Sequence, residues 1–364
     1  MKLVILDQFS DPGGAQQGLL DLLCELCARR SQVLVGLPGD GVIFDRVREL
    51  GFETERIECG PFRSGRKSIG DAARFLFQKR RLTEHIRGML ARTGSNLLYV
   101  NGPRLMPAAP CGIPVVFHAH SYIGPGPVRG LIGRALARTQ ARLIANCEFV
   151  AHPWRRFVPD ERVHIVYNGV DRAGTVAPRA EPHAPVVACI GRIAPEKGQL
   201  EFVAAARVIH GVIPDARFAI LGAPLFAEPG AARYDRAVRA AAIGLPIEFP
   251  GWVADIPAAL ADIDLLLAPS APHEATTRVI LESYAAGVPV IAFRSGGIPE
   301  VIEEDATGLL VSSAEEMGQL AIDLLRSPAR REEMSRAAED CWRRRFTLER
   351  CRREVADLLE RAAG

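Results

Sequence analysis

The segment Gly191–Gly198 reads Gly-Arg-Ile-Ala-Pro-Glu-Lys-Gly and combines glycines with two cations. It follows an apolar run that is typical of a buried strand. Glycines let the backbone approach a ligand closely, while Arg192 and Lys197 supply a planar guanidinium fork and a compact ammonium charge. These groups suit a pyrophosphate, whose charge must be held and then stabilised as it leaves. The alternative interpretation is a solvated turn between a strand and a helix.

Two carboxylates, Glu274 and Glu282, are separated by seven residues. We expect Glu274 in a loop and Glu282 about one turn or more inside the next helix, whose first N–H groups would face a ligand. A buried carboxylate needs hydrogen-bond donors, and ribose or sugar hydroxyls provide them. The alternative is that Glu282 is an exposed helix residue.

A glycine pair, Gly13-Gly14, lies in Asp11–Gln16, between a first strand and a first helix. Glycines at this place let backbone N–H groups contact an anion at the helix N-terminus. The spacing is not G-x-G-x-x-G, which disfavours a nicotinamide-binding fold. A tight turn that binds nothing is the alternative.

The run Val116-Phe117-His118-Ala119-His120 ends an apolar strand at the edge of the sheet where ligands bind. His118 is a candidate donor to a sugar hydroxyl. The pair could instead hold a metal ion, but no third ligand is evident. Either histidine could also be a hydrogen-bonded core residue.

Predicted strands and helices alternate along the chain and must position these segments. This alternation predicts parallel sheets covered on both faces. Predicted strands of the first half are Lys2–Leu6, Gln32–Gly36, Leu97–Asn101, Pro114–His118, Arg142–Ala145 and His164–Tyr167, with helices over Ala15–Arg30, Asp71–Ala91 and Arg129–Thr139. Those of the second half are Val186–Ile190, Arg217–Leu221, Ile247–Phe249, Leu265–Leu267 and Val288–Ala292, with helices over Gln199–Ile209, Tyr234–Ile243, Ser313–Arg326, Pro328–Arg344 and Leu348–Arg361.

The proline-rich stretch Asp171–Pro185 has no periodicity and is predicted to link two domains. The fold class is therefore α/β, with two doubly wound, Rossmann-like domains that face each other across a cleft. Ligands would bind there, outside the carboxyl ends of the strands.

The composition excludes several classes of protein. The 364 residues are 48% apolar and 24% charged, which is typical of a globular chain and not of a disordered or fibrous one. No apolar run approaches the length of a membrane span. Met1–Asp7 has too few consecutive apolar residues for a secretory leader. Eight scattered cysteines, with one C-x-x-C at Cys24 and Cys27, predict buried, reduced thiols and a cytoplasmic location.

A formal charge of +2 argues against a nucleic-acid partner. The charge is uneven, because residues 1–170 hold 23 basic and 15 acidic side chains, whereas the remainder holds 22 and 28. The basic excess is interleaved with apolar residues in one stretch: Arg63, Arg66, Lys67, Arg74, Lys79, Arg80, Arg81 and Arg87, with Phe62, Ile69, Phe75, Leu76, Phe77 and Leu82. Such a stretch could lie on an anionic membrane surface, although a solvated helix with one core face is the alternative.

The order of these motifs resembles that of the family 4 retaining glycosyltransferases with the GT-B fold. The resemblance rests on Gly-Gly-Ala-Gln, the strand-end histidine, Tyr-Asn-Gly-Val-Asp at 167–171, Gly-Arg…Glu-Lys-Gly and E-x7-E, and it runs from Gly13 to about Phe346. It implies an N-terminal acceptor-side domain over 1–170, joined by a C-terminal helix over 347–364. It also implies a nucleotide-sugar-binding domain over 171–346.

The resemblance implies a role for each matching residue. The backbone at Gly13 and Gly14 would contact the donor phosphate, Arg192 and Lys197 would hold the pyrophosphate, and Glu282 would bind the ribose hydroxyls. Glu274 would contact the transferred sugar, and His118 would lie beside the anomeric carbon. The loop at Trp252 and Val253 would flank the base, and Thr277, Arg278 and Val279 would line the donor site. Members of this family usually need no metal and no cofactor besides the donor, and are generally thought to retain the anomeric configuration by a same-face displacement.

One segment departs from the family pattern. The residues after Glu274 are usually glycine-rich, whereas here they read Ala275-Thr276-Thr277-Arg278. Side chains restrict this backbone, and Arg278 adds bulk and charge where helix N–H groups should face the sugar phosphate. Arg278 could add a phosphate or sugar contact, or change which donor is accepted.

We therefore predict a metal-independent hexosyltransferase that moves a sugar from a nucleotide-diphosphate donor to a glycan or lipid-linked acceptor. Its role would be cell-surface polysaccharide or glycolipid synthesis, in the cytoplasm or peripherally at the inner face of the plasma membrane. The alternatives are a non-catalytic nucleotide-sugar-binding subunit and another GT-B enzyme. A sugar-nucleotide epimerase would need catalytic carboxylates and histidines that are not evident. A phosphorylase would need a pyridoxal-bearing lysine, and Lys197 is the only lysine of the second half.

Overall fold

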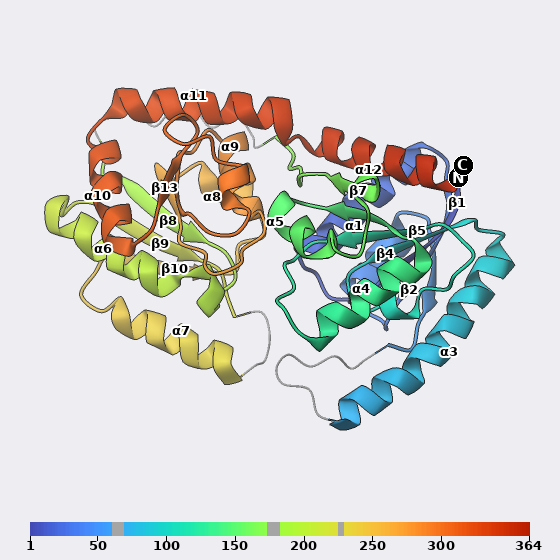
Figure 1. Ribbon diagram of the computed structural model, residues 1–364. Helices are drawn as coiled ribbons and strands as arrows, with labels where there is room; N and C mark the ends of the chain where they lie inside the picture. Colours follow the sequence, from blue (N-terminus) through green and yellow to red (C-terminus); the bar gives the residue numbers. More distant parts are fainter. Residues whose placement is uncertain (60–68, 173–182, 225–228) are drawn as a thin grey trace. The chain divides into compact units, whose positions relative to one another are not determined.

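The computed structural model describes residues 1–59, 69–172, 183–224 and 229–364, with the backbone alone for residues 69–77 and 229 (Figure 1). The chain divides into two compact units. The first unit comprises Met1–Asn168 together with Glu349–Gly364, and the second comprises Gly169–Leu348. Most of the proline-rich stretch 171–185 and part of the basic stretch lie outside the described residues.

The first unit is a parallel sheet of strands in the order β3-β2-β1-β4-β5-β6-β7. Its strands are β1 (Lys2–Asp7), β2 (Gln32–Leu37), β3 (Glu53–Arg56), β4 (Leu97–Asn101), β5 (Val115–Ala119), β6 (Arg142–Ala145) and β7 (Val163–Ile165). Its helices are α1 (Gly14–Ala28), α2 (Val42–Glu49), α3 (Ile69–Thr93), α4 (Pro127–Thr139), α5 (Glu148–Ala151) and α12 (Leu348–Ala363), with short 3-10 turns at Met106–Ala108, His152–Trp154 and Asp160–Arg162.

The second unit is a parallel sheet in the order β10-β9-β8-β11-β12-β13. Its strands are β8 (Val186–Ile190), β9 (Arg217–Leu221), β10 (Ile247–Gly251), β11 (Leu265–Ala268), β12 (Val290–Phe293) and β13 (Leu309–Val311). Its helices are α6 (Gln199–Val212), α7 (Pro229–Ala241), α8 (Ile256–Leu260), α9 (Arg278–Ala285), α10 (Ala314–Leu325) and α11 (Pro328–Arg345), with 3-10 turns at Pro195–Lys197 and Ile298–Glu300.

The central strands form because their apolar runs are covered on both faces. Residues Leu3–Leu6 of β1 and Leu97–Val100 of β4 are buried throughout, as expected of parallel strands between helix layers. The edge strand β3 differs, because Glu53–Arg56 contains no apolar residue and is partly exposed. Its pairing with β2 through backbone hydrogen bonds leaves no hydrophobic pattern to read, so the sequence did not predict it. The prediction of a strand over His164–Tyr167 was also wrong in its bounds, since β7 is Val163–Ile165.

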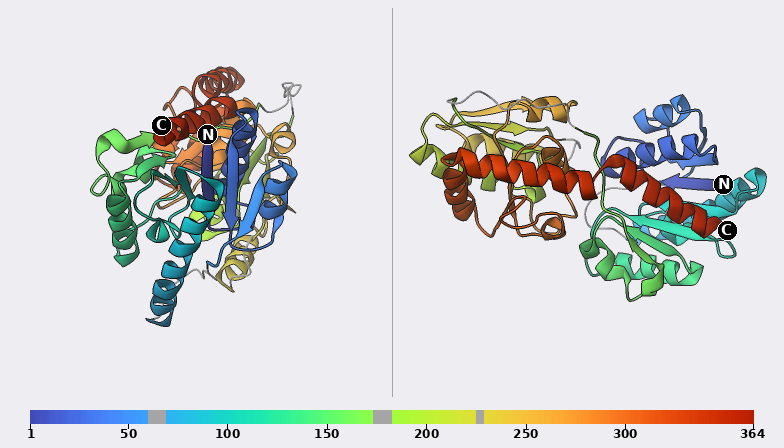
Figure 2. Two further views of the ribbon diagram at one scale, coloured as in Figure 1. Left: turned by 90° about the vertical axis from the view of Figure 1, so that its right-hand side faces the viewer. Right: turned by 90° about the horizontal axis from the view of Figure 1, so that it is seen from above.

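The last helix, α12, belongs to the first unit. Its apolar residues Val355, Leu358 and Leu359 are buried in the same core cluster as β1, β4 and α1. The ion pair Arg29–Asp357 (2.7 Å) and a hydrogen bond from Asn96 to a carbonyl near the end of α12 add polar links. The two ends of the chain consequently lie side by side in this unit (Figure 2).

Candidate functional site

Each sheet has one point where the strand order reverses, and parallel α/β sheets bind ligands at such points. In the first sheet the reversal lies between β1 and β4, where Asp7 pairs with Asn101 at the carboxyl ends of the strands. In the second sheet it lies between β8 and β11. The loops that leave these two strands carry Arg192 and Glu274. The predicted residues therefore fall at the expected edge of each sheet.

A chain of buried hydrogen bonds occupies the reversal point of the first sheet. Asn101 Nδ2 donates to Asp7 Oδ2 (2.5 Å), and Asn101 Oδ1 lies 2.6 Å from His120 Nε2. Asp7 also accepts from Gln16 Nε2 and from the backbone N–H of Phe9, both at 2.9 Å. Burial raises the pKa of Asp7 to about 6, although these three hydrogen bonds lower it. The carboxyl group is therefore held by neutral donors.

His118 lies beside this chain at the end of β5. It is 7% exposed, and its Nδ1 lies 2.6 Å from the hydroxyl of Tyr99. Its ring stacks on that of His120, with centroids 4.0 Å apart. Burial lowers the pKa of His118 well below its usual value, and His120 lowers it further; burial also lowers the pKa of His120 to about 4. Both imidazoles are thus neutral near neutral pH.

The glycine pair begins helix α1 beside this cluster. Gly13 is the N-cap residue and Gly14 the first residue of the helix, and both are exposed. A Cβ on Gly14 would have no heavy atom within 4 Å apart from its neighbours in the chain and the backbone of its own helix, so the backbone there is open to a ligand. Asn101 Nδ2 lies 3.3 Å from the carbonyl of Ala15, which ties the start of α1 to the buried chain of hydrogen bonds.

The Gly191–Gly198 loop of the second unit is shaped from within. Gln199 accepts from the backbone N–H of Ala194 and donates to the carbonyl of Arg192 at 2.9 Å. Arg192 forms an ion pair with Glu196. Lys197 Nζ lies 2.5 Å from Glu274 Oε2, and the two side chains are 22% and 16% exposed. Lys197, which is predicted to bind the phosphate, and Glu274, which is predicted to bind the sugar, are therefore in direct contact.

Two glycines let the loops around Glu274 pack closely. Gly198 has a φ of +70°, and a Cβ there would lie 2.0 Å from the carbonyl oxygen of Pro269. Gly296 has a φ of +56°, and a Cβ there would lie 1.8 Å from the carbonyl oxygen of Glu274. The same carbonyl accepts a hydrogen bond from Gly297 N–H at 3.0 Å. Only glycine fits these positions, so the backbone of Glu274 is fixed.

Glu282 lies in the second turn of α9, whose N-cap is Thr277. Arg278 begins the helix, and its Nε lies 3.8 Å from Glu282 Oε1. Burial raises the pKa of Glu282, while the Arg278 charge lowers it. Thr277 and Val279 are buried around the helix start. Arg278, which departs from the family pattern, is therefore paired with Glu282, which is predicted to bind the ribose.

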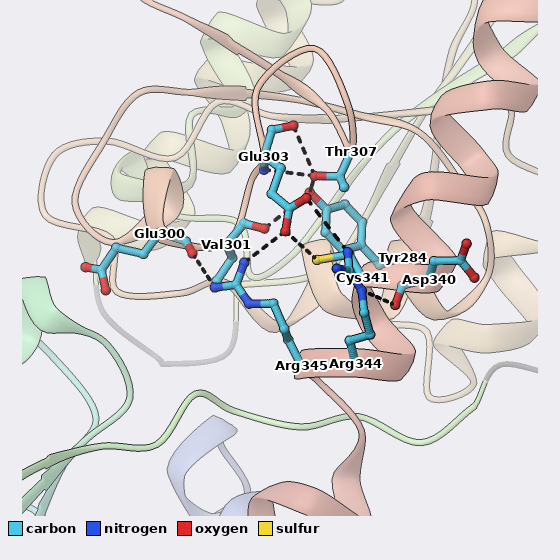
Figure 3. A network of polar contacts seen from close by, with 9 residues as sticks. All are labelled: Tyr284, Glu300, Val301, Glu303, Thr307, Asp340, Cys341, Arg344 and Arg345. Carbon is cyan, nitrogen blue, oxygen red and sulfur yellow. Dashed lines mark hydrogen bonds and ion pairs between the residues drawn. The ribbon is translucent and has the colours of Figure 1, made fainter.

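Helix α9 is anchored at its far end by the polar contacts of Figure 3. The buried hydroxyl of Tyr284 lies 2.7 Å from Thr307 Oγ1, which also accepts from the N–H of Glu303 at 2.9 Å. Arg345 of α11 donates to the carbonyl of Glu300 and pairs with Glu303. These contacts hold the helix that carries Glu282 against the segments around it.

Trp252 and Val253 follow β10 in an exposed loop. Trp252 is 59% exposed, and the carbonyl of the preceding Gly251 accepts a hydrogen bond from Gly222 N–H at 2.8 Å. A large apolar side chain left in water can stack on a flat ligand, which fits the predicted contact with a base. The structure places this loop at the carboxyl end of a strand of the second sheet.

Tyr99, Asn101 and Asp7 were not predicted as site residues from the sequence. The signal was present, since Asp7 ends β1 after four apolar residues, and Tyr99 and Asn101 are the polar members of β4. A buried polar group needs a partner, and three such residues on neighbouring strands could have been matched to one another. What the sequence alone lacked was the strand order, which puts β1 between β2 and β4.

Part of the predicted membrane-binding stretch lies on α3. Phe62, Arg63, Arg66 and Lys67 lie outside the described residues, and the side chains of Ile69, Arg74 and Phe75–Phe77 are not described either. Of the rest, Arg80 pairs with Glu84 at 3.3 Å, and Leu82 is buried. None of the described helices is both long enough and apolar enough to cross a membrane.

The described residues contain no group of three or more His, Cys, Asp and Glu side chains placed to hold a metal ion. Cys24 and Cys27 of the C-x-x-C are exposed free thiols on α1, so the prediction that they are buried was wrong. At the H-x-H pair, one nitrogen of each ring is already engaged in a hydrogen bond within the protein.

Comparison with solved structures places this arrangement among the GT-B folds. The Anabaena protein Alr3699/HepE, crystallised in complex with UDP and glucose, superposes with a TM-score of 0.80 at 23% identity, over 99% of each chain. A sucrose-phosphate synthase from Thermosynechococcus elongatus gives a TM-score of 0.80 at 17% identity, over 99% of this chain and 98% of that one. At these identities the likeness concerns the fold.

Sequence comparisons define the family. The model described as Glycosyltransferase Family 4 matches residues 12–173, and that described as Glycosyl transferases group 1 matches residues 184–327. A D-inositol 3-phosphate glycosyltransferase from Segniliparus rotundus is 32% identical over 257 residues, which cover 62% of this chain and 56% of the relative. A GDP-mannose-dependent monoacylated alpha-(1-6)-phosphatidylinositol monomannoside mannosyltransferase from Corynebacterium glutamicum is 34% identical over 165 residues, which cover 42% of this chain and 41% of the relative. The chain thus spans about half the length, or less, of these relatives, and it belongs to the family 4 glycosyltransferases.

Proposed function

We propose that this protein is a retaining glycosyltransferase that moves a sugar from a nucleoside-diphosphate donor to a glycan or lipid-linked acceptor without a metal ion. The observation that carries the proposal is the contact between Lys197 and Glu274 at the strand reversal of the second sheet, with Glu282 in the second turn of α9. It brings together a cation for phosphate and carboxylates for hydroxyl groups. Membership of the family and the names of the relatives support the same activity.

In the proposed reaction, the bond between the anomeric carbon and the diphosphate oxygen breaks, and a bond from that carbon to an acceptor oxygen forms on the same face. The acceptor proton passes to the leaving diphosphate. Arg192 and Lys197 stabilise the charge that develops on that leaving group. No side chain then needs to act as a base, which suits a first-sheet edge where both imidazoles are buried and poorly basic.

Glu274 and Lys197 would act together on the donor. An ammonium group has three N–H bonds, so Lys197 can keep its contact with Glu274 while it donates to a phosphate oxygen. Glu274 would then accept from a hydroxyl of the transferred sugar. Glu282 would accept hydrogen bonds from the ribose hydroxyls, and its contact with Arg278 would then weaken. Relatives that use GDP-mannose and a neighbour solved with UDP and glucose leave the base open.

The test is a thermal-shift panel of UDP, GDP, ADP and their sugars. A ligand that binds the native state raises its melting temperature, so the preferred base gives the largest rise. Incubation of the preferred nucleotide sugar without acceptor should then release free sugar slowly. No melting shift with any of these nucleotides would contradict the proposal.

A second candidate is a non-catalytic nucleotide-sugar-binding subunit. It is favoured by Ala275–Arg278, where buried side chains and an Arg278–Glu282 pair stand in place of glycines. This candidate predicts a clear melting shift with a nucleotide sugar but no hydrolysis and no transfer. A time course of sugar release with metal chelator present separates the two functions and tests metal independence together.

We further propose that the basic stretch Arg63–Arg87 places the protein on the anionic inner face of the plasma membrane, near a lipid-linked acceptor. The support is the charge of the first unit and the lipid acceptors named for relatives. In a flotation assay, vesicles that contain phosphatidylglycerol should carry the protein upward at low salt and release it at high salt. Equal behaviour with pure phosphatidylcholine vesicles would refute the membrane contact.

A further inference from the structure

Tyr99 and His118 share one hydrogen bond inside the first sheet. Tyr99 lies on β4 opposite Val116 of β5, so that His118 is its diagonal neighbour two residues along β5. Diagonal neighbours on adjacent strands are within reach of an aromatic side chain. The hydroxyl lies 2.6 Å from Nδ1, and the two rings meet edge to face with centroids 6.0 Å apart.

The direction of this hydrogen bond follows from what else the hydroxyl can reach. Within the described part of the chain, Tyr99 Oη has no second hydrogen-bond partner, and Tyr99 is 2% exposed. If His118 Nδ1 carried the ring proton, the hydroxyl proton would be buried without an acceptor, which is costly. The favoured arrangement is O–H donating to Nδ1. Burial raises the pKa of Tyr99 well above 10, so the hydroxyl keeps its proton.

With Nδ1 as the acceptor, the ring proton of neutral His118 lies on Nε2. This atom is buried and has no hydrogen-bond partner among the described residues. An unpaired buried N–H is uncommon in folded proteins and calls for a partner. His118 lies at the carboxyl edge of the sheet, where ligands bind. Its Nε2–H is therefore a donor available to a ligand oxygen.

The neighbouring histidine is fixed in the same way. Asn101 Nδ2 donates to Asp7 and to the carbonyl of Ala15, so Asn101 Oδ1 must accept from His120 Nε2–H. His120 is thus also a neutral imidazole with its proton on Nε2. Because its ring stacks on His118, a positive charge on one ring would disfavour a positive charge on the other. The stack therefore disfavours protonation of both rings at once.

We propose that Tyr99 is a positioning residue that holds His118 as the neutral Nε2–H tautomer, so that His118 donates a hydrogen bond to a hydroxyl oxygen of the transferred sugar. The sugar as ligand rests on the proposed function, whereas the tautomer does not. Tyr99 itself touches neither donor nor acceptor in this proposal. It acts through the ring that it orients.

The tautomer can be read directly from the protein without ligand. Long-range proton–nitrogen NMR on protein labelled with ¹⁵N-histidine distinguishes a nitrogen that bears a proton from one that does not. For His118, identified by its loss in His118→Asn, we expect bare Nδ1 and protonated Nε2. In Tyr99→Phe the nitrogen signals should shift toward the opposite tautomer or a mixture. A protonated Nδ1 in the wild type, or an unchanged His118 spectrum in Tyr99→Phe, would overturn the proposal even if the protein proves to transfer no sugar.

Kinetics test the consequence for the reaction. Tyr99→Phe should lower kcat about tenfold, the effect of losing one hydrogen bond, while the Kd for the preferred nucleoside diphosphate stays within about twofold. The control is Thr139→Val, which removes a buried hydroxyl that donates to the carbonyl of Ala135 at 2.8 Å in α4 of the same unit. It should leave kcat within about twofold of the wild type. An equal loss of kcat in both variants would assign Tyr99 a purely structural role.

Discussion

The carboxyl edge of the first sheet carries buried polar groups that are neutral or bonded to neutral partners, whereas that of the second sheet carries partly exposed ions in pairs. In the first, Asp7, Asn101 and His120 satisfy one another at 2.5–2.6 Å. In the second, Lys197 pairs with Glu274, and Arg278 pairs with Glu282. Both clusters occupy equivalent points of similar sheets, so the difference reflects what each must do.

A buried, fully bonded cluster has fixed geometry, because any movement would leave a polar atom unpaired. It suits the orientation of a single donor such as His118. The side chains of these ion pairs are 16–24% exposed. Partner exchange costs them less free energy, because water screens their charges while a pair is broken. They suit the capture and release of a charged diphosphate. The first sheet therefore has a rigid carboxyl edge that can orient a donor, and the second sheet has a charged carboxyl edge whose ion pairs can rearrange.

The largest effect is expected from Lys197→Ala. Loss of a charge-assisted contact to phosphate, together with an unpaired Glu274, should weaken nucleoside-diphosphate binding by about 100-fold, or ~3 kcal/mol. Isothermal titration calorimetry measures the Kd. Lys2→Ala, an exposed lysine of the first unit, serves as the control and should bind as the wild type does. An unchanged Kd for Lys197→Ala would remove the charged edge from the donor site.

The buried cluster at the carboxyl edge of the first sheet is tested by comparing the pH dependence of stability in the wild type and in His120→Gln. Because burial lowers the pKa of His120 from 6.5 to about 4, the unfolded state binds more protons between these values. Stability from this group is therefore complete above pH 6.5 and is lost as the pH falls toward 4. Asp7, whose pKa is raised to about 6, contributes in the opposite direction below pH 6 in both proteins.

Between about pH 7.5 and 4.5, the wild type should lose about 2 kcal/mol more of its unfolding free energy than His120→Gln does. Urea unfolding followed by tryptophan fluorescence measures this, since Trp154 packs against Phe117 of β5. Glutamine keeps an N–H donor for Asn101, so both proteins should fold at neutral pH. Parallel pH profiles would show that His120 is not held neutral.

A smaller effect is expected from Glu282→Gln. A neutral amide accepts a weaker hydrogen bond than a carboxylate, so the Kd for the nucleoside diphosphate should rise about tenfold. Inhibition by inorganic pyrophosphate, which has no ribose, should not change. Glu332→Gln is a matched control, because Glu332 pairs with Arg336 across one turn of α11 in water. A parallel loss of pyrophosphate inhibition would move Glu282 from the ribose to the phosphates.

The smallest change in affinity is expected from Arg278→Ala. The variant releases Glu282 from a 3.8 Å pair of modest strength, so the nucleoside-diphosphate Kd should stay within about threefold. The ratio of kcat/KM between competing donor sugars should shift instead, with Arg336→Ala as the control. A loss of affinity beyond about tenfold would mean that Arg278 itself binds the phosphates.

Much of this architecture could be predicted from sequence because local patterns specify it. Apolar runs such as Leu97–Asn101 and Arg217–Leu221 gave strand bounds that the structure confirms. Strand β3 was missed because Glu53–Arg56 pairs through its backbone and buries little. Strand β13 was missed because Leu309–Val311 is short, and three apolar residues have no period to read.

The candidate site was predictable where chemistry lies in one segment and not where it spans strands. Arg192 and Lys197 stand in one loop and could be named together. The Tyr99–His118 hydrogen bond joins strands whose adjacency the sequence does not state. The Arg278–Glu282 pair was predictable, because residues four apart on a helix have neighbouring side chains, but Arg278 was predicted only to contact a phosphate or sugar or to change which donor is accepted.

The discontinuity of the first unit has a consequence for biosynthesis. Residues Gly169–Leu348 are synthesised without interruption, whereas the first unit waits for Glu349–Gly364 to cover its core. A ribosome therefore releases every residue of the second unit before the last helix of the first. Because domains generally fold as units during synthesis, the second unit is expected to finish folding first. The apolar face that receives Val355 and Leu359 is meanwhile the surface that a chaperone would need to shield.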